Sequence, residues 1–287
     1  MTYKQNFSIL SLPESKFSLY KEEVTMNRLT TYIVSGALLM LTSLASADIL
    51  PGKPTVLITG SNRGIGLGFV KQFTERGWNV IATTRKPEKA EELNALAKKH
   101  KSITIEQLDV TDHARIEALA AKYKGQPIDI LLNNAGLTPK YKTAFYPLEG
   151  IDFDIALKSL KVNAIGPLKM CQAFMDHVKA SNQKKIIVIS SKAGSIPASP
   201  KMTMFYSYRG SKAALNMYMY TLSFETPEKN IILTLLSPGM VNTTEGMKLP
   251  NAIEVEESVS KMMNVIFSLT PKDNGKFLSY DGSEVDW

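Results

Sequence analysis

Thr55-Val56-Leu57-Ile58-Thr59-Gly60-Ser61-Asn62-Arg63-Gly64-Ile65-Gly66 is the stretch that decides the fold. Its first four residues are apolar or β-branched, which predicts a short strand buried on both faces. Glycines follow in the next turn, and an apolar helical pattern begins at Ile65. Glycines allow a tight turn and a close approach of phosphate to the backbone, and a helix N-terminus offers free N–H groups and a positive dipole end. The order strand, glycine turn, helix therefore predicts a dinucleotide phosphate site. An ordinary strand-to-helix turn is the alternative for such a motif standing alone.

Strand-like and helical patterns alternate along the rest of the chain. Further strands are predicted at 79–83, 103–108, 128–132, 185–190, 231–236 and 276–278. Helices are predicted after the glycine turn, at 89–100, in a segment ending at Tyr123, and at 153–179, 205–224 and 255–267. This alternation predicts an α/β fold, a single doubly wound (Rossmann) domain of about seven parallel strands with helices on both faces. The domain spans 48–287, and ligands are expected at the carboxyl ends of its strands.

The first 47 residues differ in character from this domain. Residues 1–25 show no periodicity and are predicted to be a disordered extension. Residues 26–47 contain a basic flank, an apolar run at 29–44 and the small residues Ala45-Ser46-Ala47, which together are typical of a signal peptide. The apolar run also suits an uncleaved membrane anchor. We therefore expect an exported or membrane-tethered protein, with a cytoplasmic protein as the alternative and Met26 as an alternative start.

The composition is that of an ordinary globular protein, with 44% apolar and 21% charged residues among 287. The net charge of +7 suits an anionic cofactor. The chain has no basic run with interleaved aromatics, so no nucleic-acid partner is predicted. No metal site is predicted either. Cys171 is the only cysteine, which excludes an intrachain disulfide and is typical of a buried structural thiol.

Tyr208 and Lys212 lie four residues apart and so share one face of the predicted helix. An ammonium near a phenol favours the phenolate, so we predict that Lys212 lowers the pKa of Tyr208. A tyrosine tuned in this way can exchange a proton with a carbonyl or alcohol oxygen. Ser190-Ser191 ends the fifth strand, where a serine hydroxyl could hydrogen-bond the same oxygen.

Taken in order, these motifs resemble the short-chain dehydrogenase/reductase family over about residues 54–287. The resemblance rests on the segment 59–66, Asn133-Asn134-Ala135-Gly136, Lys161-Val162-Asn163, Ser190-Ser191, Tyr208 with Lys212, and Ser237-Pro238-Gly239-Met240-Val241-Asn242-Thr243. Within the family the chain is similar to the C-factor and sniffer-like carbonyl reductases. That narrower similarity rests on Ser191-Lys192-Ala193-Gly194-Ser195-Ile196, Tyr206-Ser207-Tyr208-Arg209 and Tyr280-Asp281-Gly282-Ser283.

The resemblance implies a role for each catalytic residue. Tyr208 would be the acid/base, Lys212 would lower its pKa and bind the nicotinamide ribose, and Ser191 would orient the substrate carbonyl. Asn163 would hold a water that links Lys212 to solvent. The family's usual spacing would select Ser195, but we prefer Ser191 because it ends the strand. Tyr206 is expected to be a wall of the substrate pocket.

The end of the second strand favours NADP(H) over NAD. An acidic residue there would hold the ribose 2′-hydroxyl of NAD, but Thr83-Thr84-Arg85 stands in its place. Arg85 and Arg63 would converge on a 2′-phosphate. The alternative is that both are solvated charges and NAD also binds. The other cofactor contacts implied by the resemblance are Gly60, Ser61, Asn62, Gly64, Ile65, Gly66, Asp109, Val110, Asn133, Ala135, Gly136, Tyr208, Lys212, Pro238, Gly239, Val241 and Thr243.

The resemblance thus implies an NADPH-dependent oxidoreductase that reduces an aldehyde or ketone to an alcohol. Hydride would pass from the nicotinamide to the carbonyl carbon while Tyr208 protonates the oxygen. The alternative is a catalytically silent nucleotide-binding signalling or interaction protein, against which the intact catalytic set argues. Expected partners are a small carbonyl or alcohol substrate and further copies of the chain, as a homodimer or homotetramer, although monomers occur in the carbonyl-reductase branch. The loops 137–150 and 244–254 are expected to form the substrate pocket.

Overall fold

A computed structural model describes residues 49–138, 145–201, 203–243 and 250–287. The predicted disordered extension 1–25 and the predicted signal peptide or anchor 26–47 lie outside these ranges. Within them, no helix combines the length and the apolar character needed to cross a bilayer. All of the described residues belong to the unit Ala47–Trp287.

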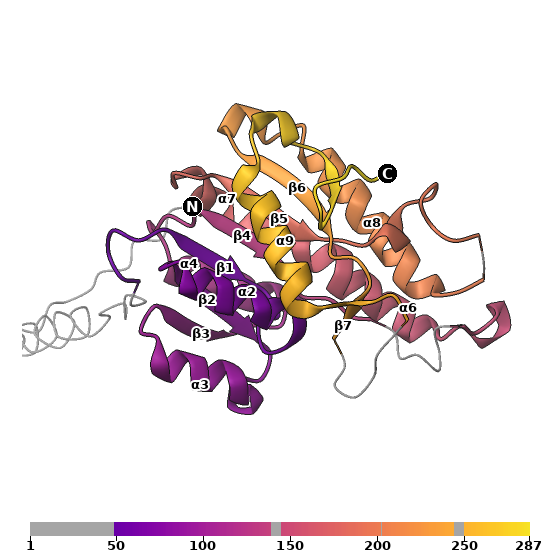
Figure 1. The fold of residues 1–287 in the computed structure, drawn as a ribbon, viewed down its shortest axis with the longest axis horizontal. Coiled ribbons are helices and arrows are strands. Elements are labelled where there is room, and N and C mark those ends of the chain that lie inside the picture. The colour runs from indigo at the N-terminus through magenta and orange to yellow at the C-terminus, as the bar shows by residue number, and fades with distance from the viewer. Residues whose placement is uncertain (1–48, 139–144, 202, 244–249) are drawn as a thin grey trace, which may run out of the picture. The chain divides into compact units, whose positions relative to one another are not determined.

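Seven parallel strands form the central sheet in the order β3-β2-β1-β4-β5-β6-β9 (Figure 1). They are β1 (Thr55–Ile58), β2 (Asn79–Thr84), β3 (Ile103–Gln107), β4 (Ile130–Asn133), β5 (Lys185–Ile189), β6 (Ile232–Ser237) and β9 (Phe277–Ser279). Val56 of β1 pairs with Val80 on one side and with Ile130 on the other. The chain therefore builds the sheet outward from β1 to β3, then returns to β4 and builds the other half. In such sheets the point where the order reverses is where ligands bind.

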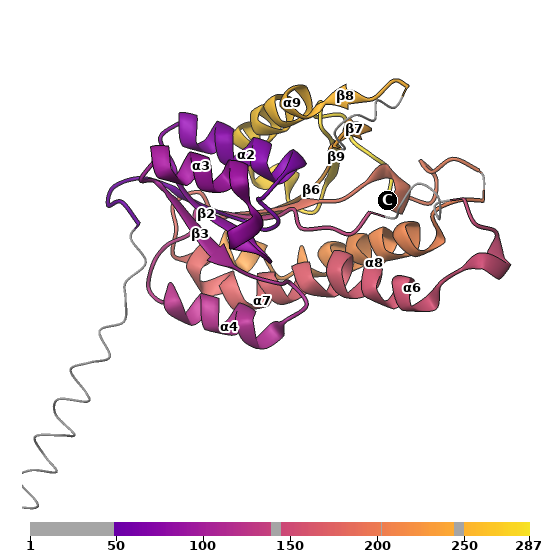
Figure 2. The ribbon, with the colours of Figure 1, turned by 90° about the horizontal axis from the view of Figure 1, so that it is seen from below.

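Two layers of helices cover the sheet (Figure 2). One face carries α2 (Gly64–Glu75), α3 (Glu91–Lys99) and α9 (Val255–Ser268), and the other carries α4 (His113–Lys122), α6 (Phe153–Leu160), α7 (Gly166–Lys179) and α8 (Tyr206–Leu222). Short 3₁₀ turns lie at Pro87–Lys89, Leu148–Gly150, Lys192–Gly194, Pro227–Lys229 and Pro271–Asp273. A second, two-stranded sheet joins β7 (Val241–Asn242) to β8 (Ile253–Glu254).

Alternate residues of each strand supply two separate cores. Val56 and Ile58 pack in the core that contains Phe73 of α2, whereas Leu57 packs in the core that contains Phe174 of α7. The strands are buried on both faces because helices cover both sides of a parallel sheet. The predicted seven-stranded, doubly wound fold is confirmed.

The structure differs from the sequence prediction in the segment 153–179. Instead of one continuous helix, α6 passes into a π-helical segment, Lys161–Ile165, and then into α7. The π-helical turn contains Asn163, whose side chain is fully buried. Single π turns inside helices are frequent at functional sites because they redirect one side chain.

Candidate active site

The glycine turn after β1 has a backbone that other residues would not adopt. Gly60 has φ +71° and Gly64 has φ +53°, both in the left-handed region. A Cβ added to Gly66 would lie 2.1 Å from the carbonyl oxygen of Gly60. The helix α2 begins at Gly64, and among the described residues no side chain caps its first amides. The turn therefore presents bare backbone and a helix N-terminus, as a phosphate site requires.

The end of β4 clamps this turn through Asn134. The hydroxyl of Thr59 accepts hydrogen bonds from the amides of Asn134 and Ala135, each at 3.0 Å. The Asn134 side chain donates to the carbonyl oxygens of Thr59 at 2.9 Å and Gly60 at 3.1 Å. These bonds fix the glycine turn against the switch point of the sheet.

Three of the predicted cofactor residues have side chains that face the interior. Asn133 is 2% exposed, and its amide nitrogen lies 3.5 Å from the sulfur of Cys171. Val110 is buried in the core, where the backbone of Gly166 approaches it. The Ser61 hydroxyl donates to Ile58, and the Ser61 amide donates to Thr83. The Asn133 side chain therefore points inward and the Ser61 hydroxyl stabilises the turn, while the predicted contact of Ser61, Val110 and Asn133 with the cofactor stays a prediction.

Cys171 has the environment expected of a structural thiol. It is fully buried, and burial raises the pKa of its thiol to about 12. The thiolate, which is the nucleophilic form, is therefore negligible at neutral pH.

Tyr208, Ser191 and Lys212 meet at the first turns of α8. A hydrogen bond joins the side chains of Ser191 and Tyr208. The Lys212 ammonium lies 5.9 Å from the centroid of the Tyr208 ring and donates to the carbonyl oxygen of Ile189 at 2.9 Å. Ser195, by contrast, is buried and accepts a hydrogen bond from the amide of Ala198 at 3.0 Å. Of the two candidate serines, Ser191 is the one that contacts Tyr208.

The prediction that Lys212 lowers the pKa of Tyr208 is wrong in this geometry. Burial raises the pKa of the Tyr208 hydroxyl, and the hydrogen bond from Ser191 opposes that rise only in part. Burial also lowers the pKa of Lys212 to about 8. Desolvation dominates because Lys212 is buried and Tyr208 is half-buried, and the Lys212 ammonium donates to the carbonyl oxygen of Ile189.

Asn163 ties three segments together beneath these residues. Its side-chain oxygen accepts from the amide of Leu137 at 2.6 Å, and its nitrogen donates to the Leu137 carbonyl and to the Ser211 hydroxyl, both at 3.0 Å. Ser211 lies on α8 between Tyr208 and Lys212. Asn163 thus fixes α8 against the segment that follows β4. Its predicted role of holding a water stays a prediction.

The segment after β6 lies over the glycine turn. A Cβ at Gly64 would meet the Thr243 side chain at 3.6 Å. Gly239 has φ +80°, and the carbonyl oxygen of Pro238 accepts from Ser258 of α9 at 2.6 Å. These contacts hold the segment after β6 at the edge of the sheet where the sequence predicts the cofactor. That segment contains the predicted cofactor residues Pro238, Gly239, Val241 and Thr243. The predicted pocket-forming loops are described only in part, because 139–144 and 244–249 lie outside the described residues.

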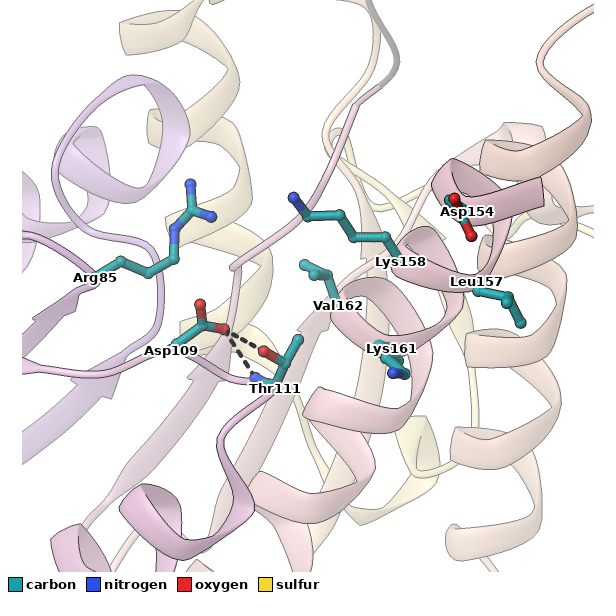
Figure 3. A pocket seen from close by; sticks show the side chains of 8 residues that line it. All are labelled: Arg85, Asp109, Thr111, Asp154, Leu157, Lys158, Lys161 and Val162. Atoms are coloured by element: carbon teal, nitrogen blue, oxygen red, sulfur yellow. Dashed lines mark hydrogen bonds between the residues drawn. The ribbon is translucent and has the colours of Figure 1, made fainter. Parts of the chain in front are cut away.

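A cavity of about 260 Å³ opens beside the end of β2 (Figure 3). Arg85 and Asp109, both predicted from the sequence, line one side, and Lys158 extends from α6 toward Arg85. The Asp109 carboxylate accepts from the amide and hydroxyl of Thr111, at 3.0 and 2.8 Å. Arg63 does not line this cavity, so its predicted convergence with Arg85 stays a prediction.

Lys158, Lys161 and Val162 also line the cavity and were not predicted to contact a ligand. They precede Asn163 on the same helical run, which is the one signal in the sequence that could have indicated them. Their proximity to Arg85 follows from the packing of α6, which sequence patterns do not reveal.

Fold and site together define an oxidoreductase with a Rossmann-type nucleotide site. Residues 54–253 match the sequence profile of the short chain dehydrogenase family. The chain belongs to this family, whose members use a nicotinamide cofactor.

Individual relatives agree with this assignment. An uncharacterised oxidoreductase of Schizosaccharomyces pombe is 33% identical over 80% of this chain and 96% of its own length. The NADPH-bound carbonyl reductase from chicken fatty liver is 36% identical, with a TM-score of 0.75 over 82% of this chain and 99% of that one. The carbonyl reductase Sniffer of D. melanogaster is 31% identical, with a TM-score of 0.76 over 82% of this chain and 100% of that one. The predicted resemblance to sniffer-like carbonyl reductases is confirmed.

Proposed function

We propose that the chain is an NADP(H)-dependent reductase that converts an aldehyde or ketone to an alcohol. The observation that carries this proposal is the hydrogen bond between Ser191 and Tyr208, one helical turn from Lys212. The two hydroxyls would supply one carbonyl oxygen with a proton donor, Tyr208, and a second hydrogen-bond donor, Ser191. The NADPH-bound chicken carbonyl reductase, which shares 36% of its sequence with this chain, supports the same reading.

The residues present fit a nicotinamide dinucleotide. The turn leaves no room for a side chain at Gly60 or Gly66, and Thr243 lies over Gly64, whose φ is +53°. When bound, the reduced cofactor supplies a hydride for the carbonyl carbon. Lys212 and the backbone of 238–243 would hold the nicotinamide end, and the glycine turn would hold the pyrophosphate.

Side chains of this protein would donate the proton that the carbonyl oxygen receives. Because burial raises the pKa of Tyr208, its hydroxyl stays protonated at neutral pH and can donate to the developing alkoxide. The Ser191 hydroxyl would donate to the same oxygen and fix its position. Asn163 would keep the first turns of α8 in register with the segment after β4.

Preference for the 2′-phosphate rests on the cavity at the end of β2. Arg85 stands where an acidic residue would select NAD. Lys158 and Lys161 line the same cavity, and among the described residues neither they nor Arg85 has an ion-pair partner. Three cations against Asp109 and Asp154 leave a positive field suited to a dianionic phosphate.

The variant Tyr208→Phe tests the mechanism. It removes the hydroxyl and keeps the ring, so we expect kcat to fall by about 10²–10⁴-fold. NADPH affinity, measured by calorimetry, should be nearly unchanged. Turnover is followed as loss of reduced cofactor with a panel of aldehydes and ketones. A variant that keeps near wild-type turnover would overturn the proposed acid/base. Tight NADPH binding by a wild-type protein that reduces none of the panel would favour the silent binding protein.

A further inference from the structure

Three residues on one face of α8 bond three consecutive residues at the end of β5. The residues of α8, spaced by four, are Tyr208, Lys212 and Asn216, and those of the strand end are Ile189, Ser190 and Ser191. The bonds made by Tyr208 and Lys212 are those of the proposed catalytic site. In the third bond, the Ser190 hydroxyl donates to the side-chain oxygen of Asn216 at 2.5 Å. This bond belongs to the same contact between helix and strand, because a spacing of four places side chains on one helix face.

Both partners in this third bond are enclosed by the protein. Ser190 is 1% exposed and Asn216 is 4% exposed. Asn216 lies one helical turn beyond Lys212, at the end of the row away from Tyr208. Because neither side chain is open to a substrate, any effect of the pair on the reaction acts through the residues beside them.

Stability alone does not explain an asparagine at position 216. Its side-chain nitrogen is buried and, among the described residues, has no hydrogen-bond partner. A buried donor without a partner destabilises the folded state. Leu215 and Met219, which are also buried on α8, are apolar and pack in the core. An apolar side chain at position 216 would avoid the unpaired donor, so the asparagine serves another purpose.

The first turn of α8, which carries Tyr208, is held by contacts further along the helix. Within the part of the chain that the structure describes, no side chain caps this turn. A helix end without a cap loses bonds that would fix its first amides. Two buried bonds tie α8 to its neighbours instead: Asn163 donates to Ser211, and Ser190 donates to Asn216.

We propose that Asn216 is a positioning residue for Tyr208. Its bond to Ser190 fixes how α8 lies along the end of β5, and so it holds the Tyr208 hydroxyl at hydrogen-bond distance from Ser191. This inference rests on the proposed function, because it concerns the same carbonyl reduction. A misplacement of about 1 Å between reacting groups lowers a rate by up to about 100-fold, so a small shift of α8 would change kcat.

The variant Asn216→Leu removes the acceptor of the Ser190 hydroxyl together with the unpaired nitrogen. We expect kcat to fall about ten- to hundredfold, while KM for the carbonyl and the affinity for NADPH change less than about threefold. Turnover is followed as loss of reduced cofactor, and calorimetry gives the NADPH affinity. A purely structural role predicts a lower Tm with kcat near the wild-type value, and that result would overturn the inference.

Ser190→Ala removes the donor with a smaller change to the core, so it tests the same bond if Asn216→Leu folds poorly. We expect a similar fall in kcat. The double variant should be about as slow as either single variant, because all three lose the same bond. Losses that multiply in the double variant would show that the two residues act separately, which would overturn the inference.

Thr226→Val is the matched control for the loss of a buried hydroxyl. The Thr226 hydroxyl is fully buried and donates to the side-chain oxygen of Asn274 at 2.9 Å. Asn274 also accepts from the amide of Leu233, near the start of β6, whereas Ser190 follows the end of β5. We expect Thr226→Val to lower Tm and to leave kcat near the wild-type value. An equal loss of kcat in Thr226→Val and Ser190→Ala would overturn the inference.

A crystal structure of Asn216→Leu gives a readout that does not depend on turnover. We expect the hydroxyls of Tyr208 and Ser191 to lie more than about 3.5 Å apart, beyond hydrogen-bond distance. An unchanged bond between them would overturn the inference. Failure of the proposed function would differ, because Tyr208→Phe would then keep wild-type turnover. If Tyr208→Phe is inactive while Asn216→Leu and Ser190→Ala are fully active, only the positioning role is wrong.

Discussion

At the residue scale, the two candidate serines, Ser191 and Ser195, lie four residues apart on one loop and make different hydrogen bonds. Ser191 hydrogen-bonds Tyr208, whereas Ser195 accepts from the backbone of Ala198. We expect Ser191→Ala to lower kcat by about 10²–10³-fold, the usual effect of losing one donor to a developing oxyanion. Ser195→Ala should lower Tm while kcat stays near the wild-type value. An equal loss of kcat in both variants would contradict the assignment of Ser191.

The variant Ser191→Ala should also shift the pH dependence of the reaction, in a direction that follows from the pKa of Tyr208. The hydrogen bond from Ser191 lowers the pKa of Tyr208, so its removal lets that pKa rise further above the usual value. In the direction of alcohol oxidation the phenolate is the base. The pH at which kcat/KM for oxidation rises should therefore be higher in Ser191→Ala than in the wild type. Ser195→Ala should leave that pH unchanged.

At the scale of elements, the sequence reveals what is local and misses what depends on packing. The strand before Gly60 and the glycine turn are predictable because burial on both faces and positive φ each restrict the residue type. The inward direction of the Asn133 side chain could not be predicted, because the sequence pattern places the end of the strand at Leu132. The π-helical turn at Asn163 and the clamp made by Asn134 arise from hydrogen bonds between distant segments. Lys158 belongs to the cavity only because α6 packs beside the sheet.

The cavity between β2 and α6 gives a prediction about the cofactor. Arg85→Ala should weaken NADPH binding about tenfold or more, since a charge-assisted hydrogen bond to phosphate is lost. Its affinity for NADH should change little. Lys158→Met should weaken NADPH binding by a smaller factor, about two- to fivefold, through reduced attraction across the cavity. Lys179→Met, at the end of α7, is the control for net charge.

Calorimetry at two salt concentrations measures both effects, because attraction between exposed charges is screened by salt. If Arg85→Ala weakens NADPH and NADH equally, the proposed selection of the 2′-phosphate is wrong. If only Lys158→Met is without effect, the phosphate is held from the side of β2 alone.

At the scale of the whole molecule, α6 and α8 lie side by side (Figure 2), and both helices carry exposed apolar side chains. Phe153 and Leu157, four residues apart on α6, are 71% and 58% exposed, and Met217 of α8 is 62% exposed. Large exposed apolar patches on soluble domains are typical of interaction surfaces. Because most homo-oligomers are built on twofold axes, we propose that two copies pair through α6 and α8.

The double variant Phe153→Lys with Met217→Lys tests this pairing by sedimentation. We expect wild type to sediment as a dimer or tetramer and the variant to shift to a smaller mass, because like charges would meet across the axis. Glu75→Lys, on α2 at the opposite face of the sheet, should leave the mass unchanged. The dissociated variant should still reduce its carbonyl substrate, because a single chain supplies all of the proposed catalytic residues, Tyr208, Ser191, Lys212 and Asn163. A variant that keeps the wild-type mass would place the interface elsewhere. A variant that dissociates and loses turnover would mean that a partner copy completes the site.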